Sequence, residues 1–200
     1  MNIVYHEKGR VFHLFNDSVS YIFMVLPHGG LGSLYYGKAL RDREGFEHIF
    51  ERVHRGMTAC VFADTRSYSL DAIRQELPTY GSSDFRRPAL NVLQENGSRI
   101  LDLQYAGYRV MDGKPKLAGL PATYAEAETE AKTLIVEVKD ELTGLRAELL
   151  YTIFAEGGAI ARSVRYINEG KEVLHLQKVM SMSMDLPDAD YDWLQLTGAW

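Results

Sequence analysis

The stretch Leu134-Ile-Val-Glu-Val-Lys-Asp140-Glu-Leu-Thr-Gly144-Leu-Arg-Ala-Glu-Leu-Leu-Tyr-Thr-Ile153 decides the fold class of this chain. Before Asp140, apolar side chains alternate with charged ones, and from residue 145 a second alternation puts apolar side chains at every other position up to Ile153. A period of two residues is typical of a β-strand that is half buried in a sheet. The residues from Asp140 to Gly144 favour a turn. The stretch therefore predicts two antiparallel strands.

The same pattern continues toward the C-terminus. Glu156-Gly-Gly158 predicts a turn into a third strand that ends at Ile167, and Asn168-Glu-Gly170 predicts the next turn. A fourth strand is expected over residues 174–184, with His175 on its polar, solvated face. Four consecutive strands of this kind make a meander. A further strand is expected over Tyr191 to Leu196.

The N-terminal part is also predicted to be β-structure. Val11 to Phe15 and Val19 to Leu26 flank the three residues 16–18, a loop length that joins hairpin strands. Apolar residues at helical spacing leave a short amphipathic helix over 41–55 open, although Gly45 weakens it. Residues 54–90 show no sustained alternation and are expected to form long, ordered connections that carry a contact surface. The 200 residues are expected to form a single domain.

Composition excludes several classes of protein. The chain has 22 Lys and Arg against 27 Asp and Glu, which gives a formal net charge of −5. Nucleic-acid binding is not expected, because it needs a basic face. The single cysteine, Cys60, cannot form an internal disulfide, so a cytoplasmic location is expected. The N-terminus does not resemble a signal peptide, and the most apolar run, Tyr21 to Leu26, is too short to span a bilayer, so no membrane partner is expected.

Known chemical motifs do not fit the sequence. The glycines around His28-Gly-Gly30 match neither a P-loop nor a dinucleotide turn. Asp188, Asp190 and Asp192 alternate as in a calcium loop, but Trp193 stands where glycine is required. The six histidines show no pair at metal-ligand spacing. No pair of carboxylates is nominated for catalysis. We therefore expect no metal, no cofactor and no catalytic residue within the chain.

Two features suggest carbohydrate contact. Trp193 and Trp200 are accompanied by carboxylates and amides, and indole rings pack on the C–H faces of sugars. Burial in a core or an interdomain seam explains these tryptophans equally well. His54 lies near Arg52, Arg55 and Arg66 in the loop-rich region, where binding residues concentrate. A structural or surface role for His54 also stays open.

Several longer motifs, taken in order, resemble a known family. They are Ser67-Tyr-Ser-Leu-Asp71, Gln75-Glu-Leu-Pro-Thr-Tyr-Gly81, Ser83-Asp-Phe-Arg86, Gly119-Leu-Pro-Ala-Thr-Tyr124, Asp190-Tyr-Asp-Trp193 and Gly198-Ala-Trp200. Together they resemble the N-terminal domain of microbial α-galactosidases in family 36 of the glycoside hydrolases. The resemblance implies an all-β fold: a large twisted antiparallel β-sandwich, or supersandwich, with long loops and at most short helices. This agrees with the strand pattern.

The resemblance also implies a function. The family's enzymes are retaining hydrolases of terminal α-1,6-linked galactose in melibiose- and raffinose-type oligosaccharides, with both catalytic aspartates on a (β/α)8 barrel that follows this domain. The 200 residues alone are therefore expected to be inactive. A tetramer is implied, in which the N-terminal loop of one subunit reaches the active site of its neighbour. On this pattern Trp200 borders the galactose pocket, Arg66 matches an arginine of the loop, and His54 stands where relatives carry a substrate-contacting aspartate.

Two alternatives remain beside this interpretation. A free-standing carbohydrate-binding β-sandwich module would use the same tryptophans and long loops. A purely structural domain would make no contact with substrate. An exposed apolar patch is expected where a barrel would pack.

Overall fold

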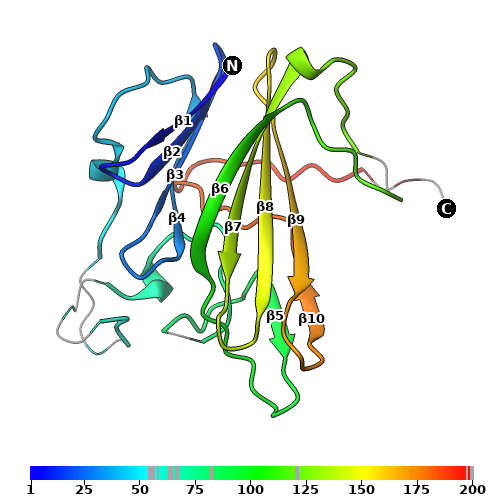
Figure 1. Cartoon of the computed structure of the whole chain (residues 1–200). Coiled ribbons are helices and arrows are strands. Elements are labelled where there is room, and N and C mark those ends of the chain that lie inside the picture. Colours follow the sequence, from blue (N-terminus) through cyan, green and yellow to red (C-terminus); the bar gives the residue numbers. More distant parts are fainter. Residues whose placement is uncertain are drawn as a thin grey trace.

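The computed structural model of the chain describes residues 1–53, 57, 59–62, 65, 68–81, 83–119, 122–196 and 198. These residues form ten strands and three short 3₁₀ helices (Figure 1). The strands are β1 (Asn2–His6), β2 (Val11–Phe15), β3 (Val19–Val25), β4 (Leu31–Lys38), β5 (Leu90–Leu93), β6 (Gln104–Asp112), β7 (Ala131–Lys139), β8 (Leu145–Phe154), β9 (Ile160–Asn168) and β10 (His175–Val179). The 3₁₀ helices are η1 (Phe46–Ile49), η2 (Leu70–Ala72) and η3 (Glu128–Glu130).

The first sheet is an antiparallel meander in the order β1-β2-β3-β4. It contains the predicted hairpin, in which Val11 pairs with Met24 and Phe15 with Ser20. The pairing of β3 with β4 shifts register between Ile22 and Phe23, which marks a β-bulge. The hairpin prediction is confirmed, and strands β1 and β4 extend it on both sides.

The second sheet is also an antiparallel meander, in the order β6-β7-β8-β9. Its middle strands are those predicted from the alternation, with Leu134 opposite Tyr151 and Val138 opposite Ala147. The inner faces of the two sheets pack together in one core, in which Phe12 stacks on Phe23 of the first sheet and Phe23 stacks on Tyr151 of the second. Figure 1 shows the two sheets side by side as the layers of a sandwich. The all-β sandwich prediction is therefore confirmed.

Three local predictions need correction. The expected fourth strand of the meander is shorter, His175–Val179, and pairs with β5 in a separate sheet through an irregularity between Leu176 and Lys178. No strand forms over Tyr191–Leu196: Trp193, Leu194 and Leu196 are almost fully exposed and no neighbouring strand of the described chain offers its backbone to this segment. Apolar alternation without a pairing partner is not enough to form a strand.

The amphipathic helix that the sequence left open over 41–55 does not form in the described part of that range, residues 41–53, apart from one turn. This turn is η1, which begins after Gly45 with a φ of 88°. Phe46 and Ile49 of this turn pack against Val11 and Ile22 on the outer face of the first sheet. The helical spacing of these apolar residues therefore reflects the packing of one short turn on the sheet, and not a full helix. No helix within the described residues is long and apolar enough to cross a membrane.

Candidate functional site

The three residues singled out for substrate contact, His54, Arg66 and Trp200, lie outside the residues that the structure describes. Parts of the loop region that carries His54 and Arg66 are described. Among them, residues 59–62 and Leu70 line a cleft. This cleft is the candidate functional site.

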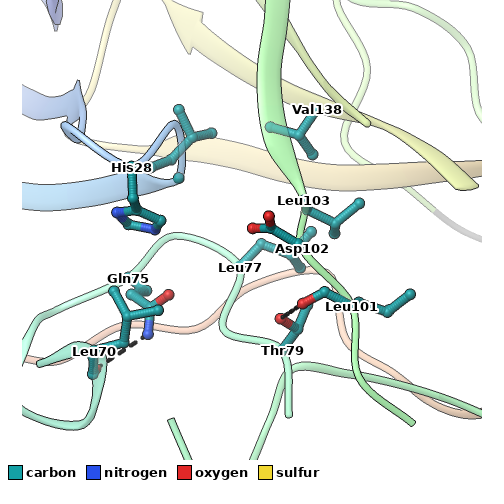
Figure 2. A pocket seen from close by; sticks show the side chains of 11 residues that line it. His28, Leu70, Gln75, Leu77, Thr79, Leu101, Asp102, Leu103 and Val138 are labelled. Atoms are coloured by element: carbon teal, nitrogen blue, oxygen red, sulfur yellow. Dashed lines mark hydrogen bonds between the residues drawn. The ribbon is translucent and has the colours of Figure 1, made fainter. Parts of the chain in front are cut away.

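The cleft opens between the 59–62 segment and the start of β6, and its outer part has a volume of about 430 Å³. A narrower inner part continues toward Val138 of the second sheet. His28 and Asp102 line both parts, and Figure 2 shows their side chains facing each other across the inner part. Most other lining residues are apolar or uncharged: Leu31, Leu70, Leu77, Leu101, Leu103, Gln75, Thr79, Ser83 and Gln104.

His28 is held by the tight turn between β3 and β4. The Gly29 N–H donates to the Leu26 carbonyl at 2.8 Å, and the Leu26 N–H donates to the Gly30 carbonyl at 2.8 Å. Gly29 has a φ of 95°, and a Cβ at Gly30 would lie 2.3 Å from the His28 ring. The turn therefore requires both glycines: Gly29 for its backbone conformation and Gly30 for the space that the imidazole occupies.

A hydrogen bond of 2.8 Å joins His28 Nδ1 to the Tyr68 hydroxyl, and their rings meet edge to face. Burial lowers the pKa of His28, while the charge of Asp102 opposes that shift. Burial also raises the pKa of Tyr68. At neutral pH the pair therefore consists of a neutral imidazole and a neutral phenol, which suits hydrogen bonding to hydroxyl groups.

Asp102 is positioned by its backbone. Its N–H donates to Asp140 Oδ2 at 2.7 Å, and Asp140 is buried at the start of the β7–β8 turn. The Asp102 carboxylate accepts a hydrogen bond of 2.8 Å from the side-chain amide of Gln104. Nearby, the Thr79 hydroxyl donates to the Leu101 carbonyl at 3.2 Å (Figure 2). The entry to β6 is thus tied to two other segments.

Among the described lining residues Asp102 is the only carboxylate. Hydrolysis of a glycosidic bond requires two carboxyl groups on either side of that bond. The described part of the cleft can bind a polar ligand through His28, Asp102 and Gln104, but it does not hold the pair that this reaction needs.

A sequence model described as the glycosyl hydrolase family 36 N-terminal domain matches residues 29–200. The chain belongs to glycoside hydrolase family 36. Along its whole length, this family 36 chain is 44% identical to the α-galactosidase AgaA of Geobacillus stearothermophilus, of which it covers 27%.

Solved structures agree with this assignment. The crystal structure of the family 36 α-galactosidase AgaB from Geobacillus stearothermophilus has a TM-score of 0.90 and 43% identity, over all of this chain and 27% of that one. The structure of an AgaA variant in complex with raffinose has a TM-score of 0.87 and 45% identity, over 95% of this chain and 26% of that one. The family 36 chain thus spans about a quarter of the length of these relatives.

Part of the cleft was visible in the sequence, because Leu70, Gln75 and Ser83 belong to the motifs that carry the family resemblance. His28 and Asp102 were not predicted: His28 was considered only as part of a glycine-rich turn, and Asp102 belongs to no motif. The signal available for His28 was the glycine pair that follows it at a strand end, because a tight turn there presents its neighbours to a loop region. Trp193, which was expected either in a core or at a sugar site, is 91% exposed, so it lies outside the core of the described chain.

Proposed function

We propose that the chain is the N-terminal, non-catalytic domain of a retaining α-galactosidase that removes terminal α-1,6-linked galactose from melibiose- and raffinose-type oligosaccharides. The observation that carries this proposal is the end-to-end similarity to AgaA. The complex of an AgaA variant with raffinose supports the substrate class. The chain spans a quarter of such relatives, so the catalytic barrel and its two carboxylates would follow it.

The domain would support the barrel through an apolar surface. Large apolar side chains of the C-terminal segment are exposed: Met180, Met182, Leu186, Tyr191, Trp193, Leu194 and Leu196. Exposed apolar patches of this kind mark interaction surfaces. The proposed occupant is the remainder of the same polypeptide, as the incomplete coverage of the relatives suggests.

The loop region would also contribute to the substrate rim and to subunit assembly. We assign His54, Arg66 and Trp200 to this rim. The cleft of His28 and Asp102 would lie at the base of the loop that carries His54 and Arg66. A cytoplasmic tetramer is the proposed form of the full-length protein. Light scattering of the purified full-length protein tests the tetramer, and cell fractionation tests the location.

The decisive experiment compares the full-length protein with the 200-residue chain. The full-length protein should release galactose from melibiose and raffinose, and the 200-residue chain should release none. Titration calorimetry of the chain with melibiose distinguishes the alternative. A free-standing binding module would bind measurably on its own, whereas a domain that supplies only part of a pocket would not. Absence of galactose release by the full-length protein would overturn the proposal.

The rim assignment has its own test in the full-length enzyme. Trp200→Ala should raise KM or lower kcat for melibiose, and Arg66→Ala should act in the same direction. His54→Asp should change the ratio of kcat/KM between melibiose and raffinose. Exposed Glu44→Ala serves as the control. Kinetics indistinguishable from the control would remove a residue from the rim.

A further inference from the structure

We propose that His6, His13 and Asp42 form a binding site for a divalent transition metal ion, with Zn²⁺ as the preferred occupant. His6 Nε2, His13 Nδ1 and one carboxylate oxygen of Asp42 all lie within 4.8 Å of one another. The three residues come from β1, β2 and the segment that follows β4. The site lies on the outer face of the first sheet, away from the cleft of His28 and Asp102.

The register of the first sheet brings the two histidines together. His6 pairs with Val11 and His13 pairs with Val4, so both imidazoles project from the same face of the β1–β2 hairpin as diagonal neighbours. The segment after β4 crosses this face. There Asp42 Oδ1 lies 2.9 Å from His6 Nε2 and 2.7 Å from His13 Nδ1.

The ring of His13 is held as metal-bound imidazoles usually are. Its side chain is fully buried, stacks on Phe15 and meets Phe46 edge to face. Its second nitrogen, Nε2, lies 2.9 Å from the Ser20 hydroxyl, which also accepts a 2.9 Å hydrogen bond from the Leu40 N–H. A histidine that ligates a metal commonly donates its other N–H to such a partner. The Ser20 oxygen can accept that N–H and leave the Nδ1 lone pair to the ion.

The chemical types of the three ligands also suit zinc. Two imidazole nitrogens and one carboxylate oxygen form a donor set that zinc accepts, with water as a fourth ligand.

Binding requires only a small local movement. Ligand atoms around a tetrahedral zinc ion lie about 3.3 Å apart, given metal–ligand distances of roughly 2.0 to 2.1 Å. The nitrogen–oxygen distances of 2.7 and 2.9 Å must therefore widen by about half an ångström. Asp42 can move in this way, because its side chain is 30% exposed and residues 39–45 around it form neither helix nor strand. The exposed side of the carboxylate leaves room for the water ligand.

A bound ion would join the 39–50 segment to the first two strands. This segment carries η1, whose Phe46 covers the outer face of the sheet. Because the ion would bind the folded state and not the unfolded chain, it should raise the thermal stability of the protein.

The test uses the intact protein after treatment with a chelator and dialysis. Titration calorimetry with Zn²⁺ should show one tight site per chain, and Co²⁺ should give the visible absorption bands of tetrahedral coordination at the same stoichiometry. His6→Asn and Asp42→Asn should each weaken Zn²⁺ binding at least about 10-fold and remove these bands. The matched control is His175→Asn, at an exposed histidine on β10, and it should bind as the unaltered protein does.

Ser20→Ala addresses the positioning of His13. It should keep the stoichiometry and weaken Zn²⁺ affinity by about 10- to 100-fold. Circular dichroism of the metal-free variants establishes that each is folded, and Asp42→Asn, at a partly exposed site, provides the test if His6→Asn does not fold. Failure of the unaltered protein to retain one Zn²⁺, or equal affinity in Asp42→Asn and in the control, would overturn the proposal and leave a hydrogen-bonded contact only.

Discussion

The Tyr151 hydroxyl donates a 2.9 Å hydrogen bond to Glu76 Oε2 in the interior between the two sheets. Glu76 belongs to the connection between η2 and β5, and only 1% of it is exposed. The same oxygen accepts a 2.8 Å hydrogen bond from Tyr21 of β3. Burial raises the pKa of both tyrosines well above the usual value, so both hydroxyls remain donors. One carboxylate therefore connects both sheets to the loop region.

Removal of this carboxylate should destabilise the sandwich. Glu76→Ala leaves two buried hydroxyls without their acceptor, and we expect a loss of about 2 to 4 kcal/mol in the free energy of unfolding. Glu76→Gln retains one carbonyl oxygen and should lose less. Urea denaturation measures both, with Glu44→Ala at an exposed site as the control. A midpoint for Glu76→Ala equal to that of the control would contradict the prediction.

Stability should fall as the pH is lowered below about 6.5, the usual pKa of histidine. Burial lowers the pKa of His28 in the folded chain, so the unfolded chain takes up its proton first as the pH falls. The free energy of unfolding then declines between the unfolded and the folded pKa, and is unaffected by His28 above that window. The lowered pKa of His13 acts in the same direction.

The contribution of His28 can be separated by substitution. His28→Gln removes the titrating group and should flatten the decline, as measured by denaturant unfolding at a series of pH values. His175→Gln, at an exposed site, provides the comparison. If the free energy of unfolding falls equally steeply with pH in the two variants, His28 does not contribute to the loss of stability.

Two glycines with similar backbone conformation should respond differently to alanine. Gly144 and Gly157 have φ values of 73° and 80°. A Cβ at Gly144 would lie 2.6 Å from the Gly170 nitrogen, whereas one at Gly157 meets nothing within 4 Å. Gly157→Ala should therefore cost about 1 to 2 kcal/mol for the left-handed conformation alone. Gly144→Ala should cost clearly more. Equal melting temperatures of the two variants would refute the close packing of the Gly144 turn against Gly170.

Asp140 should stabilise both a turn and the cleft. Its carboxylate accepts hydrogen bonds from the N–H groups of Asp102, Leu142 and Thr143. Asp140→Ala should lower the free energy of unfolding by about 2 to 3 kcal/mol. Asp17→Ala, at an exposed turn, should change it little. Hydrogen exchange should also become faster at the Asp102 amide; unchanged exchange there would show that Asp140 does not hold the entry to β6.

Strands β7 and β8 were identified because apolar side chains alternate with polar ones along them. Val136 and Tyr151 belong to such strands, and their alternation is visible without a structure. Strand β6 was missed because it is largely exposed on both faces, so its sequence carries little period. The strand expected over 191–196 was wrong for the converse reason: it alternates, but it has no partner.

The sites depend on tertiary contacts that the sequence does not display. His28 and Asp102 belong to segments far apart in the chain, and the sandwich brings them together. Histidine spacing within one segment indicated no metal site, because that criterion finds only ligands on a single helix or loop. His6, His13 and Asp42 meet through strand register and a crossing segment, which spacing does not reveal.

The order in which the two inner faces are synthesised has a consequence for folding in the cell. The fully buried residues of the face that carries Phe12 and Phe23 are complete at Leu31, but the fully buried residues of the opposite face are made only from Leu134 onward. At roughly 5 to 20 residues per second, the ribosome needs about 5 to 25 seconds to supply that counterpart. During this interval the nascent meander exposes stacked aromatic rings to water. Chaperones that capture apolar nascent segments should therefore engage the first forty residues and release them once β8 has emerged.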